Sequence, residues 1–273
     1  MIYAVVPAQN EEKRIGAVLR HLLNLKIDNI VVILNGSRDN TLQEIKKIKA
    51  GNLEVIFFRD SLGIDVPRAL GAKYAYSNGA HHVLFVDGDM VGDISNELHC
   101  LIQNTIKKDL DLGMTNCYPN ISAKNYLTRQ ITFFRQLLNR EIGLLDKIGI
   151  SIPSHGPHMV SRRLLTRVPF EELAVPPVEM VLAYMENLSI GISVEIPHCL
   201  LGSSIKNYYH NQMITRTIAG DCLEALSVYQ QRPRSRVYKN FEYVGYHRER
   251  RWDMLANFLP DMEKLNIQKE KHL

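Results

Sequence analysis

Short apolar runs alternate with amphipathic stretches along the first third of the chain. Mainly apolar runs cover residues 2–7, 29–34, 54–58 and 82–86, and each is short enough to form a buried strand. Between the first two runs, apolar residues recur at helical spacing over residues 15–23. Strands that alternate with helices form a parallel sheet that is covered on both faces. The pattern therefore predicts an α/β fold with a Rossmann-like, mostly parallel sheet and helices on both of its faces.

The remaining two thirds of the chain have a less regular pattern. Apolar residues at helical spacing over residues 123–146 predict a long amphipathic helix. Its polar side carries three arginines, Arg129, Arg135 and Arg140. Two interpretations of this helix are open: a core-packing helix with a solvated polar side, and a helix that contacts a membrane surface or an acceptor. A further strand is expected over residues 191–196 and a further helix over residues 207–230.

Polar clusters follow three of the predicted strands. They cover residues 9–12, 35–39 and 87–89. In parallel α/β sheets, ligands bind outside the carboxyl ends of the strands, which is where these clusters fall. Asp87 and Asp89 occupy alternate positions of an extended segment, so both carboxylates can face one hard cation such as Mg²⁺ or Mn²⁺. A turn that only ends the strand is the alternative.

Two further polar residues suit a phosphorylated or nucleotide ligand. Asn35 lies at the end of the second strand, where its amide can hydrogen-bond a base or a sugar, and Gly36 permits a tight turn after it. Arg68 follows Pro67 at the start of a helix of small residues and is suited to clamping a diphosphate or a base. The alternatives are a helix-capping turn at Asn35 and a surface position for Arg68.

Three segments resemble, in order, the motifs of the family-two nucleotide-sugar glycosyltransferases, which have the GT-A fold. Residues 5–11 (VVPAQNE) are similar to the opening strand and loop of that family, residues 35–41 (NGSRDNT) to its D-G-S-x-D-x-T turn, and residues 87–89 (DGD) to its D-x-D motif. The resemblance covers about the first 90 residues. It implies a donor-binding half, residues 1–92, and an acceptor-binding half with a basic C-terminal tail, residues 93–273, within one continuous domain.

The resemblance also implies which residues bind the donor and its cation. The donor pocket is expected to be lined by Pro7, Ala8, Asn10, Glu11, Asn35, Arg68, Asp87 and Gly88. Asp87 is expected to touch the ribose or the metal, and Asp89 to hold Mg²⁺ or Mn²⁺ on the diphosphate. Residues 202–206 resemble a loop that closes over the donor phosphates, with Lys206 near their charge. His198 and His210 flank this loop and are the candidates for a third metal ligand, of which His210 is preferred.

A carboxylate in the acceptor half is the candidate catalytic base. An inverting transferase needs such a group to take the acceptor proton while the metal stabilises the departing nucleoside diphosphate. Glu179, with Glu171 or Glu172 as substitutes, resembles the family's catalytic carboxylate at the start of a helix. The chain is also similar to the retaining glucosyl- and mannosyl-phosphoglycerate synthases, which share this layout without needing a base. Both stereochemical outcomes therefore stay open.

Composition narrows the class of partner. The chain has 273 residues and a formal net charge of +4, which suits phosphorylated ligands or an anionic membrane surface but is too small to indicate nucleic acid. Its four cysteines lack the short spacing of zinc or redox sites, and no apolar run reaches the roughly 20 residues of a membrane span. We expect a cytoplasmic protein, with peripheral contact at the inner face of the membrane as a further option.

The C-terminal tail concentrates arginines around aromatic residues over residues 232–252. Three interpretations are open: a solvated basic face, a site for a phosphorylated acceptor, and contact with anionic lipid headgroups. The first is preferred because charged runs are usually solvated.

These features together predict a metal-dependent glycosyltransferase that moves a hexose from a nucleoside-diphosphate sugar, of the UDP or GDP type, to a hydroxyl acceptor. Phosphorylated and lipid-linked acceptors both fit. The alternatives are a GT-A-like nucleotidyltransferase and a non-catalytic sugar-nucleotide-binding protein. Nucleotidyltransferases usually carry a basic, glycine-rich loop after the first strand, and residues 7–12 contain neither glycine nor lysine. The sequence leaves the oligomeric state open.

Overall fold

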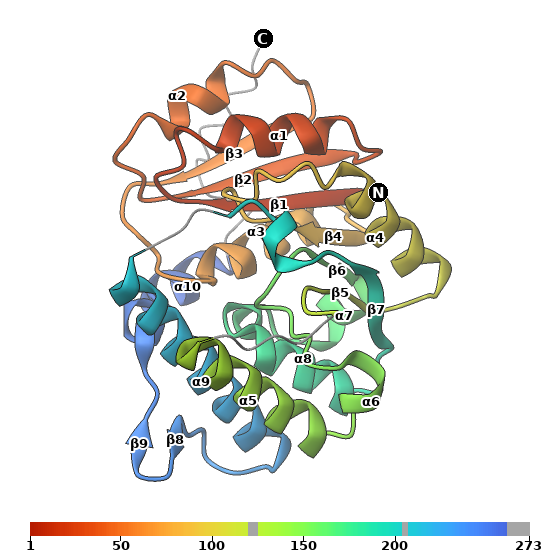
Figure 1. Cartoon of the computed structure of the whole chain (residues 1–273). Helices are drawn as coiled ribbons and strands as arrows, with labels where there is room; N and C mark the ends of the chain where they lie inside the picture. The colour runs from red at the N-terminus through yellow and green to blue at the C-terminus, as the bar shows by residue number, and fades with distance from the viewer. Residues whose placement is uncertain (120–124, 204–206, 261–273) are drawn as a thin grey trace.

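One seven-stranded sheet runs through the molecule in the order β3-β2-β1-β4-β6-β5-β7 (Figure 1). The computed structural model describes residues 1–119, 125–203 and 207–260. The strands are β1 (Ile2–Ala8), β2 (Asn29–Asn35), β3 (Leu53–Phe58), β4 (His82–Phe85), β5 (Leu112–Asn116), β6 (His158–Ser161) and β7 (Ile190–Glu195). The first four strands are parallel to one another, and β6 runs antiparallel to both β4 and β5. The expected mostly parallel sheet is confirmed.

Helices cover both faces of this sheet. One face packs against α1 (Ile15–Leu23), α2 (Thr41–Lys46) and α4 (Ser95–Lys107). The other packs against α3 (Val66–Ser77), α5 (Tyr126–Glu141), α8 (Pro176–Met185), α9 (Tyr208–Tyr229) and α10 (Trp252–Phe258). Side chains alternate along β1, so that Val5 packs on the face covered by α3 and Val6 on the face covered by α1. The buried, β-branched strands of the N-terminal half explain why their positions could be predicted.

Short elements complete the fold. They are α6 (Leu145–Ile148), α7 (Arg162–Arg167), the 3-10 helices η1 (Phe170–Ala174), η2 (His198–Leu200) and η3 (Gly245–Glu249), and a hairpin of β8 (Val237–Tyr238) and β9 (Phe241–Glu242). The last of the 3-10 helices brings the C-terminal segment back to the loop after β3. Glycine is required there, because Gly63 has a φ of +83° and an added Cβ would lie 2.2 Å from the carbonyl oxygen of Glu249.

The long helix differs from its expected form in length and in orientation. It begins at Tyr126, where Asn125 accepts a capping hydrogen bond from the backbone N–H of Thr128 at 2.9 Å, and it ends at Glu141. Gly143, with a φ of +73°, follows that end. Arg135 was expected on the polar side of the helix, but only 1% of its surface is exposed, so it is buried.

Two expectations concern residues outside the described ranges: Lys206, and the first two positions of the helix expected over residues 123–146. Among the helices that the structure describes, none is both long and apolar enough to cross a membrane.

Candidate active site

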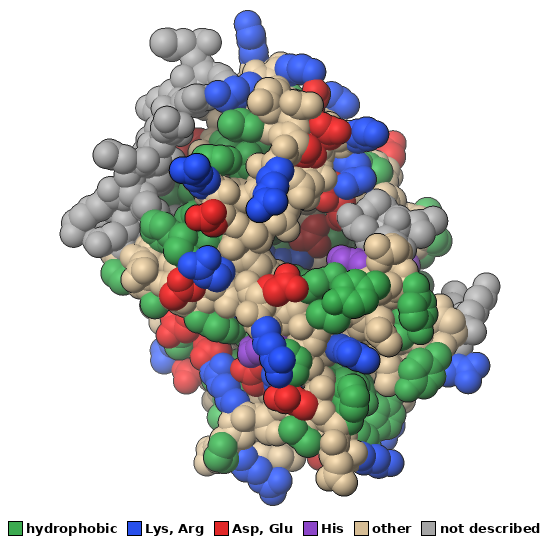
Figure 2. Space-filling model, turned by 90° about the vertical axis from the view of Figure 1, so that its left-hand side faces the viewer, with side chains coloured by type: hydrophobic (Ala, Val, Ile, Leu, Met, Phe, Trp, Pro, Cys, Tyr) green, Lys and Arg blue, Asp and Glu red, His purple; other side chains and the backbone are tan. Residues whose placement is uncertain are grey.

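A pocket of about 440 Å³ opens at the carboxyl ends of β1, β2 and β4. It gathers most of the residues expected to bind donor and metal: Pro7, Ala8, Glu11, Asn35, Arg68, Asp87, Gly88, Asp89 and His210. On the face shown in Figure 2, acidic, basic and histidine side chains meet in a hollow at mid-height of the molecule. The coincidence of polar clusters with strand ends in the sequence therefore corresponds to one site in space.

Arg68 holds the first carboxylate of the Asp87-Gly88-Asp89 motif. Its Nη2 donates a hydrogen bond to Oδ1 of Asp87 at 2.6 Å, and its Nε lies 3.4 Å from Oδ1 of Asp65. Only 6% of Arg68 is exposed, which excludes a surface arginine. Burial raises the pKa of the Asp87 carboxyl above its usual range, and the charge of Arg68 opposes that rise. Arg68 thus favours the ionised form of Asp87.

Gly88 allows both aspartates to reach the same pocket. Its backbone N–H donates to the carbonyl oxygen of Pro7 at 3.0 Å, and an added Cβ would lie 3.0 Å from both that oxygen and the Cβ of Ala8. The motif therefore packs directly on the end of β1, and the carboxylates of Asp87 and Asp89 line the pocket on either side of the glycine.

The two loops that follow β1 and β2 are tied together by side chains. The backbone N–H of Glu11 donates to Oγ1 of Thr41 at 2.7 Å, and Asp39 accepts from the backbone N–H groups of Glu12 and Thr41 at 3.0 Å each. Asn10 was expected to line the donor pocket, but it is not among the residues that line it. Its Oδ1 instead accepts from the backbone N–H of Arg38 at 2.9 Å, so it acts within this loop–loop contact.

Asn35 lines the pocket, but its amide is engaged by the backbone. Its Nδ2 donates to the carbonyl oxygen of Gly63 at 3.1 Å, and its Oδ1 accepts from the N–H of Leu62 at 2.6 Å. Asn35 therefore fixes the loop after β3, whose residues Ser61 and Gly63 form part of the pocket wall.

His210 enters the pocket from the start of α9. Asn207 caps that helix by accepting from the backbone N–H of His210 at 2.8 Å, and Nδ1 of His210 lies 2.9 Å from the hydroxyl of Tyr246. Among the described residues, however, the acidic and histidine trio whose ligand atoms lie within 4.8 Å of one another is Asp221, Glu224 and His247. His210 lines the same pocket as Asp87 and Asp89, but the ligand atoms of these three residues do not all lie within 4.8 Å of one another.

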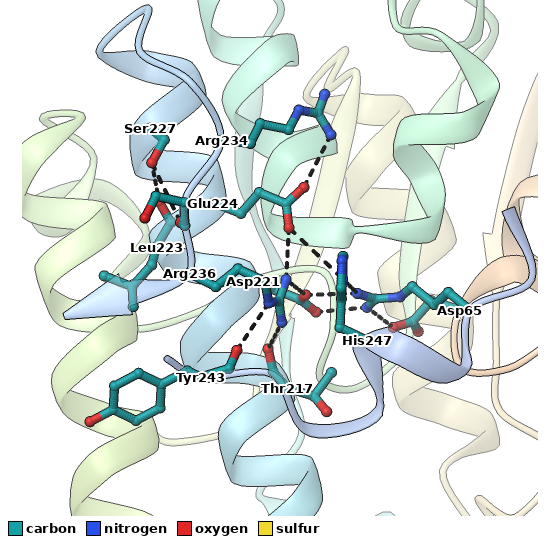
Figure 3. Close-up of polar contacts among 12 residues, drawn as sticks. Asp65, Thr217, Asp221, Leu223, Glu224, Ser227, Arg234, Arg236, Tyr243 and His247 are labelled. Atoms are coloured by element: carbon teal, nitrogen blue, oxygen red, sulfur yellow. Dashed lines mark hydrogen bonds and ion pairs between the residues drawn. The ribbon is translucent and has the colours of Figure 1, made fainter. Parts of the chain in front are cut away.

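That trio is an ion-pair cluster rather than a metal site, because guanidinium groups occupy it (Figure 3). Nη1 of Arg236 lies 2.7 Å from carboxylate oxygens of both Asp221 and Glu224. Arg250, with none of its side chain exposed, donates to both oxygens of Asp221 at 2.8 Å and to Asp65 at 3.2 Å. Each buried charge thus has an opposite charge within hydrogen-bond distance.

The expected solvated basic face of the tail is wrong for these two arginines. Asp221 and Glu224 are buried on α9 and need partners, and Arg236 and Arg250 supply them. Because Asp65 also contacts Arg68, the cluster connects the C-terminal segment to the pocket wall.

The sequence of residues 3–168 matches the family profile described as glycosyl transferase family 2, which is more than half of the chain. The chain belongs to glycosyl transferase family 2. The resemblance noted from its strand-end motifs is therefore confirmed.

Two curated proteins are similar to parts of this family-two chain. An uncharacterised protein of Methanocaldococcus jannaschii is 36% identical over 155 residues, which are 55% of this chain and 63% of that protein. A UDP-N-acetylglucosamine–dolichyl-phosphate N-acetylglucosaminyltransferase of Methanococcus voltae is 32% identical over 103 residues, 33% of this chain and 41% of that protein. The chain thus matches less than two thirds of the length of both relatives.

Solved structures of glucosyl-3-phosphoglycerate synthase from Mycobacterium tuberculosis share the fold. The complex with Mn²⁺ and UDP-glucose is similar with a TM-score of 0.62 and 19% identity, covering 87% of this chain and 81% of that one. The complex with phosphoglyceric acid has a TM-score of 0.63 and 16% identity, covering 87% and 82%. The expected GT-A-type α/β fold is thereby confirmed.

Glu179 lies in the first turn of α8, at the start of a helix as expected. Its carboxyl, however, is buried away from the pocket in which a catalytic base would act. It is 1% exposed and is not among the residues that line the pocket. Burial raises the pKa of its carboxyl to about 8, against the opposing charge of Arg68, so the group is mostly protonated at neutral pH. The substitutes do not line the pocket either: Glu171 is exposed, and Glu172 pairs with Arg234 at 2.5 Å.

Several pocket residues were not anticipated from the sequence, namely Asp65, Ser154, Asp221, Tyr246 and Glu249. One signal was available: Asp221 and Glu224 lie within one turn of a largely apolar part of a helix, which indicates buried carboxylates that need partners. Their partners lie 15 and 29 residues away from Asp221 in the sequence, so no local pattern identifies them.

Proposed function

We propose that this family-two chain is a metal-dependent glycosyltransferase that moves a hexose from a nucleoside-diphosphate sugar to an acceptor hydroxyl. The observation that carries the proposal is the joint placement of Asp87, Asp89 and Arg68 in one pocket at the carboxyl ends of parallel strands. A UDP-type donor is favoured over a GDP-type one, because the named curated relative and the structural neighbours both use or bind uridine diphosphates.

The donor set suits a hard divalent cation. Asp87 and Asp89 offer carboxylate oxygens, which Mg²⁺ and Mn²⁺ prefer, and His210 would be the third ligand. Similar structures were crystallised with Mn²⁺ or Mg²⁺ and UDP. When bound, such a cation would offset the charge of the departing diphosphate.

The chain's own residues would orient the donor around that cation. Arg68 would favour the ionised form of Asp87 and hold it in position, since it contacts that carboxylate from a buried site. Asn35 holds the loop at Leu62 and Gly63 in place by two hydrogen bonds. It would therefore contribute to base recognition both by lining the pocket and by fixing the loop that forms part of the pocket wall. Neither role requires a side chain to move.

We further propose that the protein can contact an anionic membrane surface, one of the options that the sequence left open. Tyr126 is 70% exposed and Phe241 45%, and the guanidinium of Arg216 lies 5.5 Å from the ring centroid of Phe241. Exposed aromatic and basic side chains together suit a headgroup region. Co-sedimentation with vesicles that contain phosphatidylserine, but not with neutral vesicles, would support this contact.

A thermal-shift panel tests the donor proposal. UDP, GDP and their common hexose conjugates are each added with and without Mn²⁺, and a ligand at 100 times its Kd stabilises the folded protein by about 2.7 kcal/mol. We expect a Mn²⁺-dependent shift with uridine nucleotides. Absence of any nucleotide-dependent shift would contradict the proposal.

Turnover separates the remaining alternatives. A glycosyltransferase releases UDP from UDP-hexose, a nucleotidyltransferase forms the sugar nucleotide from UTP and a sugar phosphate with release of diphosphate, and a binding protein does neither. We expect release of UDP. The release of diphosphate instead would favour the nucleotidyltransferase.

A further inference from the structure

Arg135 of α5 is a buried cation that has no anionic partner among the residues that the structure describes. Its exposed fraction is 1%, and neither its Nε nor its Nη2 has a hydrogen-bond partner in the part of the chain that the structure describes. The guanidinium lies over the ring of Tyr118, whose centroid is 5.5 Å from the guanidinium carbon. A buried charge in this state is costly, which makes Arg135 unlike the other buried arginines of this protein.

The helix directs Arg135 toward the segment that borders the pocket. Asn139 lies one turn further along α5, on the same side, and its Nδ2 donates to the carbonyl oxygens of Gly149 and Ser151 at 2.7 and 3.0 Å. The hydroxyls of Ser151 and Ser154 are also buried and have no hydrogen-bond partner within the described ranges, and Ser154 lines the pocket. The segment that Asn139 holds, one turn from Arg135, therefore carries these two hydroxyls, and that of Ser154 reaches the pocket wall.

Two histidines, His155 and His198, lie close to Tyr118, the residue that Arg135 contacts. Nε2 of His155 lies 3.1 Å from Nδ1 of His198, and the ring of Tyr118 stacks on both imidazoles. Burial, together with the charge of Arg135, lowers the pKa of His155 and of His198. Neutral imidazoles can donate hydrogen bonds without adding further positive charge.

We infer that Arg135, with Ser154 and His155, forms a subsite for a phosphate group carried by the acceptor. The inference rests on the proposed transferase function and names the class of its acceptor. A guanidinium offers the paired N–H donors that phosphate oxygens accept, and its desolvation is offset when such an anion binds. Nη1 of Arg68 donates to the carbonyl oxygen of Pro153 at 3.3 Å, so the subsite adjoins the pocket wall that Arg68 supports.

The first test is calorimetric titration of inorganic phosphate into the full chain that has been saturated with UDP and Mg²⁺, so that the donor site is occupied. We expect wild-type protein to bind phosphate and Arg135→Gln to bind it at least tenfold more weakly. Arg140→Gln is the matched control, because Arg140 is an exposed arginine of the same helix. Equal phosphate binding by wild type and Arg135→Gln, or no binding by wild type, would overturn the inference.

A stability measurement guards against misfolding of the variant. Without phosphate, Arg135→Met should keep or raise the Tm, because it removes an unpaired buried charge. Phosphate should raise the Tm of wild type but not that of Arg135→Met. A large fall in Tm for Arg135→Met without ligand would show that the arginine has a structural partner, and would contradict the subsite.

The donor and acceptor claims fail separately. Asp89→Asn should lose Mg²⁺-dependent UDP binding and keep phosphate binding, whereas Arg135→Gln should do the reverse. If wild type binds no UDP, the proposed function fails while the phosphate titration, repeated without nucleotide, still decides the subsite.

The phosphate carrier is distinguished by two probes. One is 3-phosphoglycerate in solution, and the other is a polyprenyl phosphate in phosphatidylcholine vesicles. Binding of either that is lost in Arg135→Gln supports the subsite and identifies a soluble or a lipid carrier. Binding that Arg135→Gln retains would contradict it.

Discussion

The guanidinium of Arg68, on α3, donates a hydrogen bond to the carboxylate of Asp87 at 2.6 Å. A residue outside the strand-end motif therefore positions the first carboxylate of that motif. Arg68 in turn lies 3.4 Å from Asp65, which Arg250 contacts at 3.2 Å. The candidate metal site is thus supported by a line of alternating charges that reaches the C-terminal segment.

Replacing Arg68 by lysine tests this support. Lysine keeps the charge but lacks the planar fork that contacts Asp87 and Asp65 together. We expect Arg68→Lys to fold and to lose at least tenfold in Mg²⁺-dependent UDP affinity, about 1.4 kcal/mol, as measured by calorimetry. Wild-type affinity in Arg68→Lys would show that the contact does not position Asp87.

Removal of Arg250 should destabilise the whole protein. Arg250→Met leaves the buried Asp221 with fewer partners, and breaking a buried ion pair from one side costs roughly 3–5 kcal/mol. Chemical denaturation measures the change. Arg248→Met is the matched control, since Arg248 is exposed and its pair with Glu242 is on the surface, and we expect a change within about 0.5 kcal/mol. Similar stabilities of the two variants would contradict the burial of Arg250.

Gly63 should be intolerant of a side chain. Gly63→Ala would place a Cβ 2.2 Å from the carbonyl of Glu249 in a left-handed backbone conformation, and should lower the Tm and weaken UDP binding together. Gly51→Ala is the control because an added Cβ there has no atom within 4 Å. If Gly63→Ala kept both properties, the C-terminal segment would not pack against the pocket loop as described.

Glu179 should make stability depend on pH. The raised pKa means that the protonated carboxyl contributes stability that is complete below about pH 4.5 and is lost as pH rises through about 8. The loss can reach about 1.4 kcal/mol per pH unit in that window. We expect Glu179→Gln to flatten this dependence in urea denaturation, while Glu171→Gln, at an exposed position, leaves it unchanged.

The same variant addresses catalysis. Because Glu179 is buried and does not line the pocket, Glu179→Gln should retain glycosyl transfer close to the wild-type rate. A loss of transfer by several orders of magnitude in a stably folded Glu179→Gln would restore this residue as the base.

The pocket residues of the N-terminal half could be predicted from the sequence because their signals are local. Continuous apolar runs indicated the four parallel strands, and the clusters at Asn35 and Asp87 follow those strands directly. Strand ends of a parallel sheet lie at one edge, so order along the chain was enough to place these residues together.

The C-terminal half depends on contacts that no local pattern reveals. The helical periodicity of α5 placed Arg135 on a polar side, but the buried surface of that helix is wider than its apolar stripe and includes both Arg135 and Asn139. In the same way, Arg250 is one of several arginines in a basic tail, and only the fold brings it to Asp221.

The central claim is a metal-dependent nucleotide site at Asp89. Calorimetric titration of UDP, with and without Mn²⁺, tests it in wild type, in Asp89→Asn and in Asp93→Asn, whose carboxylate is exposed and does not line the pocket. We predict Mn²⁺-dependent binding in wild type and Asp93→Asn and its loss in a folded Asp89→Asn. Binding that is independent of Mn²⁺, or that persists in Asp89→Asn, would contradict the account.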